Sequence, residues 1–434
     1  MKNMCGSFSD GISNLPNIVI EKILVLMPLR DAVRTSLLSK KWRYNWITIP
    51  ELVFDDTSLV DPSPIFSRQR LPPDQLSSRN RLFATIYHVL LLHRGAILKF
   101  ILSISELKSC SEIDALITIL SSNGIQELAL KIWKGDPHKL PPSLFSFQQL
   151  THLNLQFCVL KLPTTFKGFP RMVCLELHKV IITADKFQTF ISSCPILEQL
   201  TFESSTCFDF IGIDAPNLKV LSFIGIFKSL KVKNAPHLAN FSIDSKASVG
   251  IVERGGDKFG WAGFFDSLPV LKNLHMGGQY LMSLGEAGLG RRLLTSWGLN
   301  FLELSDVRLG VQVVCWTVLG LIKISPKLRK VIIKPITTGN EYEVAVLKYC
   351  EVNMNRSKFY LNHLREVEMC LVSGTPIELQ FMKLLLAKSR VLESMVVKPD
   401  PAKVFDGGLT ILKELSQFQR LSPKAKIMYK DTNK

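Results

Sequence analysis

The nine residues FPRMVCLEL, at positions 169–177, contain the pattern that sets the fold of this chain. A proline stands two residues before an L-x-x-L-x-L-type unit, which here begins at Met172. Positions one, four and six of the unit point into a shared core, the last two because side chains alternate along a strand, while positions three, five and seven stand out on the opposite face. The stretch therefore predicts a short strand with one apolar face.

The same unit recurs along most of the chain. The five other copies with a proline at the same offset are CPILEQLTF from Cys194, APNLKVLSF from Ala215, APHLANFSI from Ala235, LPVLKNLHM from Leu268 and SPKLRKVII from Ser325. Related units without that proline start at Ile97, Ile125, Leu150, Leu299, Leu364 and Leu392. Successive units are 20 to 36 residues apart, which is typical of leucine-rich repeats with insertions.

A single unit of this kind cannot bury its own apolar edge, whereas stacked units share a continuous core. The proline ends the segment before it, because it lacks a backbone donor and restricts the preceding residue. The sequence thus predicts an α/β fold, a curved solenoid with a parallel sheet on one side. Unrelated strands in a sandwich are the alternative, but they would not explain a proline at one fixed offset six times.

The N-terminal stretch LPNIVIEKILVLMPLRDAVRTSLLSKKWRYNW, residues 15–46, predicts three short helices. Pro16 fits the first turn of a helix that Pro28 ends, and its apolar residues recur at helical spacing: Ile20, Ile23, Leu24 and Met27. Asp31 favours the start of a second helix, and Ser39 can cap a third that carries Trp42 and Trp46. About forty residues are too few for a self-sufficient core, so these helices pack on the solenoid or await a partner.

Between the helices and the repeats lies DDTSLVDPSPIFSRQRLPPDQLSSRNR, residues 55–81. Prolines, serines and charges dominate it, which predicts a linker. We place this linker at residues 51–81.

The N-terminal string resembles an F-box of the plant type, with its L-P, L-x-R-D-A-V-R-T-S, L-S-K and W-R landmarks. The C-terminal LREVEMCLVSGTPIELQFMKLLLAKSRVLESMVV, residues 364–397, and LSPKAKIMYK, residues 421–430, look like the FBD region that closes many plant F-box/leucine-rich-repeat proteins. The resemblance implies four parts: a three-helix F-box at 10–50, the linker, a leucine-rich-repeat solenoid at 82–354 and an FBD region at 355–430 that continues the repeats.

The resemblance also implies a function, that of the substrate-receptor subunit of an SCF-type ubiquitin ligase. In that family the F-box docks on a Skp-type adaptor, which a cullin-RING ligase holds, and the repeats capture a target protein. Carried across by position, the expected adaptor contacts are Leu15, Pro16, Ile20, Ile23, Leu24, Val33, Leu38 and Trp42. Some of these side chains are expected to form a miniature core as well, because a three-helix unit has an inside and a docking face.

Two other interpretations stay open at this point. The chain is alternatively a repeat scaffold that binds an adaptor or another partner without promoting ubiquitination. A receptor that needs a small-molecule ligand in its repeats is also compatible with the sequence.

The charge pattern of the repeats bears on the target. From the unit at Leu150 to Ser305, positions three, five and seven carry no Lys or Arg, but they include Glu176, Glu203, Asp244 and Glu303. The outer units supply Lys99, Lys131, Lys330, Lys334 and Lys398. A nucleic-acid-binding protein would carry Lys and Arg on this face of its sheet, because they neutralise the phosphates. No nucleic-acid partner is therefore expected. Our hypothesis is that the middle of this face prefers a neutral or basic protein segment.

The composition limits the remaining classes. The chain has 434 residues and a formal charge of +16, but its basic residues are scattered in ones and twos, which indicates a solvated surface. Nine cysteines without a CxxC pair suggest thiols in a reducing compartment, and no signal-peptide core is present, so nucleus or cytoplasm is expected. The longest apolar run, residues 311–324, is too short to span a bilayer, and no membrane partner is expected.

Enzyme motifs do not occur in the sequence. There is no G-x-S-x-G elbow, no Walker loop and no HExxH or clustered His/Cys/Asp set at ligand spacing. We therefore expect no catalytic residue, no cofactor and no metal in this chain.

Overall fold

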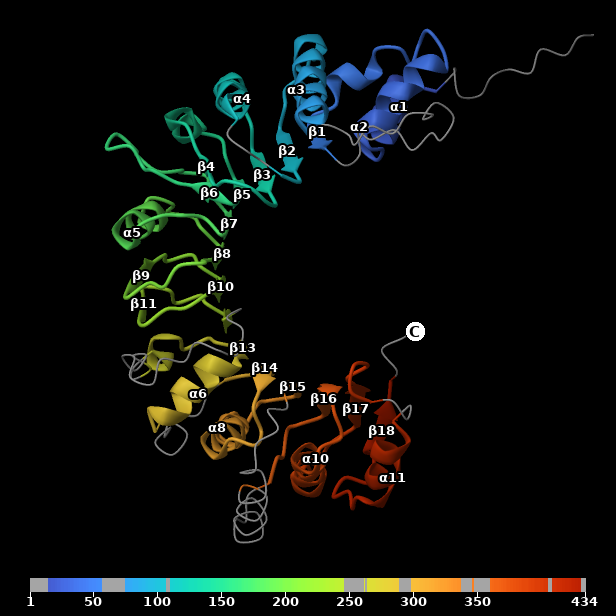
Figure 1. Cartoon of the computed structure of the whole chain (residues 1–434), viewed down its shortest axis with the longest axis vertical. Coiled ribbons are helices and arrows are strands. Elements are labelled where there is room, and N and C mark those ends of the chain that lie inside the picture. The colour runs from blue at the N-terminus through green and yellow to red at the C-terminus, as the bar shows by residue number, and fades with distance from the viewer. Residues whose placement is uncertain are drawn as a thin grey trace, which may run out of the picture. The chain divides into compact units, whose positions relative to one another are not determined.

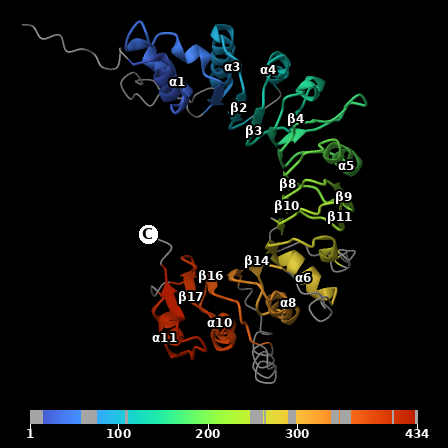
Figure 2. The ribbon, with the colours of Figure 1, turned by 180° about the vertical axis from the view of Figure 1, so that it is seen from behind.

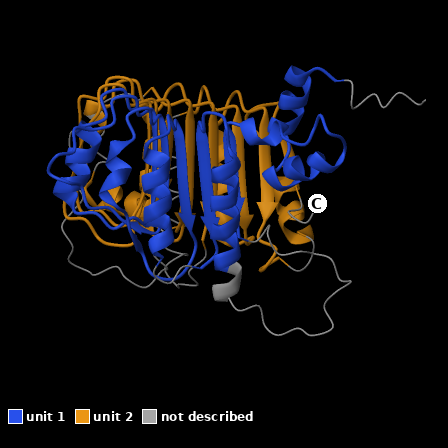
Figure 3. Ribbon diagram, turned by 90° about the horizontal axis from the view of Figure 1, so that it is seen from above, with its two compact units in different colours: residues 1–197 blue, residues 198–434 orange. Residues whose placement is uncertain are grey.

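The computed structural model describes residues 15–56, 75–106, 110–245, 261, 264–288, 298–336, 346, 360–404 and 408–430. The chain divides into two compact units, residues 1–197 and 198–434 (Figure 3). Each unit is built on a parallel sheet, as the repeats predict.

Unit 1 begins with the N-terminal helical segment. It comprises α1 (Asn17–Val25), α2 (Leu29–Arg34) and two 3₁₀ helices, η1 (Thr35–Leu37) and η2 (Asn45–Thr48). Pro16 and Pro28 directly precede α1 and α2, which fits their missing donors.

The third predicted helix is only partly formed. Residues 40–44 are in turns, and the short 3₁₀ helix η2 follows them. Three β-branched residues, Ile47, Thr48 and Ile49, disfavour a longer helix, and Pro50 drives Ile49 into an extended conformation with ψ of 122°. The two tryptophans that this segment carries, Trp42 and Trp46, are nevertheless buried.

The start of the sheet differs from the predicted linker. Strand β1 (Glu51–Asp55) follows the helical segment directly and pairs in parallel with β2 (Lys99–Ile104). Helix α3 (Gln75–Leu92) also begins inside residues 51–81. The alternating apolar residues Leu52 and Phe54 explain β1, because they give a short strand one buried face. The proline-rich part of the linker, residues 57–74, lies outside the described residues.

The sheet of unit 1 continues from β2 through β3 (Glu127–Ile132) and β5 (His152–Gln156) to β7 (Cys174–His178), all parallel. A small ladder, β4 (His138–Lys139) with β6 (Cys158–Val159), lies beside it, and η3 (Pro142–Ser146) precedes β5. Helices α3, α4 (Ser111–Ser121) and α5 (Ala184–Ser192) lie on one side of the strands (Figures 1 and 2).

Unit 2 repeats this layout. Its parallel strands are β8 (Gln199–Glu203), β10 (Val220–Ile224), β12 (Asn240–Asp244), β13 (Asn273–Gly277), β14 (Phe301–Val307), β15 (Lys330–Pro335), β16 (Glu366–Val372), β17 (Ser394–Pro399) and β18 (Lys426–Tyr429). A second ladder joins β9 (Ile211–Asp214) to β11 (Leu230–Lys233), and the 3₁₀ helix η4 (Phe265–Ser267) precedes β13. Helices α6 (Gly278–Glu286), α8 (Gln312–Lys323), α10 (Pro376–Lys388) and α11 (Leu409–Gln417) lie on one side of the sheet (Figure 1).

The recurring proline has a defined structural role. It occupies the second position of a tight turn, in which the N–H of position one of the unit donates to the carbonyl of the residue before the proline. The six such hydrogen bonds are Met172 to Phe169, Leu197 to Cys194, Leu218 to Ala215, Leu238 to Ala235, Leu271 to Leu268 and Leu328 to Ser325, at 3.0–3.3 Å. The fixed φ of proline suits this turn position. Each proline thereby forms the turn from which the next strand starts.

Burial follows the predicted alternation. Met172, Leu175 and Leu177 have no exposed surface, whereas Cys174 and Glu176 between them are partly exposed. We call the sheet face with positions three, five and seven the open face, and the positions across neighbouring strands row three, row five and row seven. The apolar positions one, four and six form the core between the sheet and the helices.

Candidate protein-interaction surfaces

The N-terminal helices expose large apolar side chains. Leu37 is 89% exposed and Leu38 is 58% exposed. Other large exposed apolar side chains of this segment are Ile18, Val19, Val25, Leu26 and Tyr44. So much exposed apolar surface in about thirty residues makes this segment a candidate protein-binding surface.

The structure separates the eight predicted adaptor contacts into two groups. Ile20, Leu24 and Trp42 are buried in the small core of the segment, so in this conformation they have no surface for a partner. These three are the residues that form the miniature core expected from the sequence, and their contact with an adaptor stays a prediction. The five with exposed surface are Leu15, Pro16, Ile23, Val33 and Leu38.

Sequence reasoning missed several exposed positions of the same segment, Ile18, Leu26 and Tyr44 among them. The apolar spacing of a helix shows which residues share its buried face. It does not show which apolar residues outside that face stay in solvent.

The helical segment is joined to the first repeats by hydrogen bonds. The Pro50 carbonyl accepts from the N–H groups of Leu98 and Lys99, at 2.9 and 3.1 Å. The Arg94 N–H donates to the Ile47 carbonyl at 2.9 Å, and Nε2 of His93 donates to the Ile49 carbonyl at 2.9 Å. These contacts fix the orientation of the segment on the sheet of unit 1.

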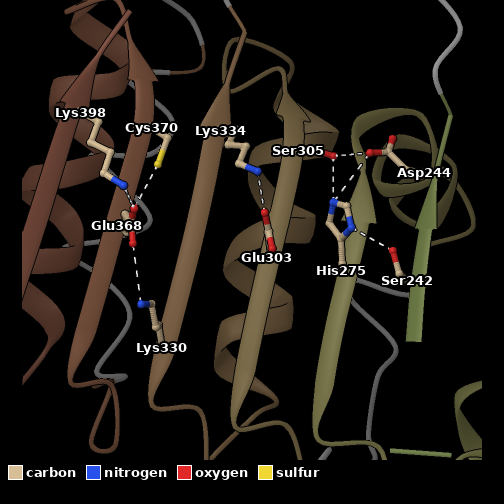
Figure 4. Close-up of polar contacts among 10 residues, drawn as sticks. All are labelled: Ser242, Asp244, His275, Glu303, Ser305, Lys330, Lys334, Glu368, Cys370 and Lys398. Atoms are coloured by element: carbon tan, nitrogen blue, oxygen red, sulfur yellow. Dashed lines mark hydrogen bonds and ion pairs between the residues drawn. The ribbon is translucent and has the colours of Figure 1, made fainter. Parts of the chain in front are cut away.

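On the open face of unit 2, lysines and glutamates of neighbouring strands pair with each other (Figure 4). Lys334 Nζ lies 2.6 Å from Oε1 of Glu303, and this hydrogen bond raises the pKa of Lys334. Glu368 accepts from Lys398, which raises the pKa of Lys398, and Lys330 Nζ lies 3.7 Å from Glu368. The charges of β14 to β17 are therefore largely balanced within the sheet.

Asp244 belongs to a hydrogen-bond network next to these pairs (Figure 4). Its Oδ2 accepts from Oγ of Ser305 at 2.9 Å, and Nε2 of His275 lies 3.7 Å away. Nδ1 of His275 is 2.9 Å from Oγ of Ser242. A Cβ at Gly277 would come within 2.0 Å of Asp244 Oδ1, so only glycine leaves room for the carboxylate. The network holds Asp244 in one position.

The four predicted target-binding carboxylates have different environments. Glu176, in unit 1, is partly exposed, with Nε2 of His178 at 3.7 Å and a hydrogen bond from Asn154. Asp244 and Glu303, in unit 2, keep partial exposure on the open face. Glu203 is only 8% exposed, although row seven was expected to stand in solvent. The expected exposure of Glu203 is therefore not found, and the other three residues keep surface for a target.

Five of the described cysteines are poorly suited to nucleophilic chemistry. Burial raises the pKa of Cys110, Cys174 and Cys370 to about 11. It raises the pKa of Cys158 and Cys194 to about 12. These thiols are protonated at neutral pH, and the thiolate is the reactive form.

Among the described residues, no three His, Cys, Asp or Glu side chains come together as a metal site. In the same part of the chain, no helix combines the length and apolar character needed to cross a bilayer.

Comparison with known proteins shows that the N-terminal helical segment and the repeats both match one family. A model of the F-box domain matches residues 12–47, and a model described as FBD-associated F-box protein At5g56370, LRR repeats, matches residues 113–254. The chain is 34% identical over 433 residues to the F-box/FBD/LRR-repeat protein At1g13570 of Arabidopsis thaliana, covering 98% of this chain and 99% of the relative. It is 27% identical over 473 residues to the putative FBD-associated F-box protein At5g56440 of the same plant, covering 97% and 100%.

Proposed function

The chain belongs to the F-box/FBD/LRR-repeat family, and from this premise we propose that it is the substrate-receptor subunit of an SCF-type ubiquitin ligase. Its F-box docks on a Skp-type adaptor, which links it to a cullin-RING ligase, and its repeats capture a target protein. The chain contributes no catalytic residue. It promotes ubiquitination by holding a target lysine close to the ubiquitin donor, which is catalysis by proximity.

The exposed apolar surface of the F-box carries this proposal. Full burial of a large apolar side chain contributes roughly 1.5–3 kcal/mol, so several of them offset the entropic loss of association. We propose adaptor contacts at the predicted residues that keep exposed surface, together with additional exposed ones, Ile18, Leu26, Leu37 and Tyr44. Ile20, Leu24 and Trp42 support these contacts from inside the F-box.

For the target, we propose that the middle repeats prefer neutral or basic protein segments on their open face, with a contact at Glu176 in unit 1 and contacts at Asp244 and Glu303 in unit 2. Row seven of β8 to β14 carries no lysine or arginine. Burial is the main cause that raises the pKa of Asp306, and the nearby charge of Asp244 adds to it. A basic side chain of a target would be attracted to these two carboxylates.

Two exposed leucines of the F-box allow a test of adaptor docking. The double variant Leu37→Asp and Leu38→Asp should lose co-purification with a Skp-type adaptor and a cullin, because two charges cannot be buried in an apolar interface. Leu409→Asp, at an exposed leucine of α11, is the matched control and should keep both partners. Adaptor binding that survives the double variant would refute the docking surface.

Delivery for ubiquitination needs a second readout. Proximity labelling in cells with the proteasome blocked, compared between the intact chain and the double variant, should label the same targets. Without proteasome inhibition, these targets should accumulate only with the variant. If the adaptor complex forms but no labelled protein changes in abundance, the scaffold alternative is correct. A reducing compartment, nucleus or cytoplasm, is the proposed location.

The charge preference of the open face has its own test. Glu176→Lys should weaken capture of the labelled targets, and Glu286→Lys, an exposed carboxylate on a helix, should not. Equal capture by both variants would remove the proposed preference for basic segments.

A further inference from the structure

We propose that the open face of β1 to β3 is an anchoring site for the target, and that it binds a segment with a bulky apolar side chain next to a carboxylate. This inference rests on the proposed function and specifies the chemistry of the target. It concerns a surface of unit 1 that contains none of the proposed adaptor contacts.

An apolar row crosses these three strands. Val53, Ile101 and Ala129 are register partners in row five, at about 4.8 Å from strand to strand. Val53 is 47% exposed, and Ile101 is partly exposed. Ala129 is only 8% exposed and has only a methyl group, so the surface is lower beside Ile101. An isolated exposed aliphatic residue is common in proteins, but adjoining ones on a rigid sheet form a surface that a partner side chain can cover.

Trp133 lies at the end of the same surface. Its backbone N–H donates to the Ile104 carbonyl at 3.0 Å, and its indole N–H donates to Oγ of Ser103, in row seven of β2, at 3.1 Å. The ring is held in place and still 59% exposed. Binding to a ring that is already oriented loses little side-chain entropy, and tryptophan is enriched among residues that dominate interface energies.

The charges around this row define the partner further. Lys99 lies between Glu51 and Glu127, with Nζ at 3.5 and 3.2 Å from their carboxylates, so these three charges are already paired. Lys131, in row seven of β3, has no carboxylate within 4.0 Å among the described residues. Lys131 lies two residues before Trp133 and the exposed Lys134 directly follows it, so a partner carboxylate has a lysine on either side of the tryptophan in the sequence.

A protein segment fits this arrangement better than a nucleic acid. The few lysines beside this row that are not already paired cannot neutralise a run of phosphates, whereas one lysine is enough to pair with a single carboxylate. The anchor thus requires an apolar side chain over Ile101 and Ala129, packed against the indole, with Asp or Glu beside Lys131.

A displayed library of random twelve-residue peptides provides the probe. It is selected on the purified full chain in complex with a Skp-type adaptor. Enriched peptides should carry Leu, Phe or Trp next to Asp or Glu. A synthetic peptide of the enriched sequence should bind Trp133→Ala and Ile101→Asp at least about tenfold more weakly than the unchanged chain.

Matched controls separate this site from a general loss of structure. Phe210→Ala, at an exposed aromatic residue of unit 2, should leave peptide binding unchanged. Trp133→Ala should unfold at the same temperature as the unchanged chain, because its ring is mostly exposed. Lys131→Glu should shift the selected peptides from acidic to basic residues beside the apolar anchor.

Selected peptides that are basic, or that bind Trp133→Ala and Phe210→Ala equally well, would overturn the inference, as would a selection without enrichment. The adaptor in the same complex reports separately on the proposed function. Loss of peptide binding with intact adaptor binding rejects only the anchoring site.

Discussion

Substitution by alanine at two leucines of the F-box should have different effects, one on adaptor binding and the other on stability. Leu38→Ala should weaken adaptor binding without changing the stability of the chain. Leu24→Ala should destabilise the F-box and affect the adaptor only through that loss. The difference follows from their exposure, because Leu38 is 58% exposed and Leu24 has no exposed surface.

The exposed fraction sets the expected magnitudes. Full burial of a leucine contributes roughly 1.5–3 kcal/mol, so the exposed part of Leu38 contributes about 1–1.7 kcal/mol when an adaptor covers it. This corresponds to a roughly 5- to 20-fold higher Kd for Leu38→Ala. Leu24→Ala leaves a cavity in a small core, and such changes lower the free energy of unfolding by about 2–5 kcal/mol.

Two measurements on the same preparations check this reasoning. Calorimetric titration with a Skp-type adaptor gives the Kd, and thermal unfolding without the adaptor gives the stability. Adaptor should restore the folded F-box in Leu24→Ala at high concentration, because it binds only the folded form. The assignment of core and docking face is refuted if Leu38→Ala binds normally, or if Leu24→Ala weakens binding while its unfolding is unchanged.

Three further predictions concern the repeats. Gly277→Ala should lower the free energy of unfolding by about 1–3 kcal/mol in urea titrations, because the new Cβ collides with Asp244, whereas Gly124→Ala, with open space around it, should change it by less than about 0.5 kcal/mol. Pro216→Ala should destabilise by about 0.4–1 kcal/mol, since the unfolded chain gains freedom at that turn, and equal urea midpoints would contradict this role of the proline. Burial raises the pKa of Glu378, so its contribution to stability is fully present below the unfolded pKa and is lost as pH rises through the folded one. Glu378→Gln should therefore flatten the fall in stability above the usual glutamate range, which urea titrations at several pH values can measure.

Much of the repeat architecture was predictable from the sequence. The period and the apolar positions depend on local rules of strand alternation, and Leu175, Leu177 and their equivalents are buried as expected. The burial of Glu203 was not predictable in this way. Its alternation places it on the open face, but its exposure depends on cross-strand neighbours and on the turn that begins at Ser204, whose N–H donates to the Ile224 carbonyl.

The partners of charged residues were also beyond sequence reasoning. Glu303 belongs to a group of repeats without lysine in rows three, five and seven, yet Lys334 of the next strand reaches it. Sequence positions show which residues share a face, whereas ion pairs between strands depend on register and side-chain length. The acidic character of the open face is therefore weaker at Glu303 than the sequence indicates.

The presence of strand β1 where the sequence predicted a linker has the largest consequence for function. A flexible linker would let the repeats sample many orientations relative to the F-box, and a tethered target would then meet the ubiquitin donor at a low effective concentration. Instead, Ile49 and Pro50 lead directly into β1, and the hydrogen bonds from His93, Leu98 and Lys99 fix that entry. A target bound at the proposed anchoring site would therefore be held by the same compact unit that contains the F-box. Proximity accelerates a reaction only where such distances are restricted, so the rigid entry into β1 serves the proposed function better than the predicted linker would.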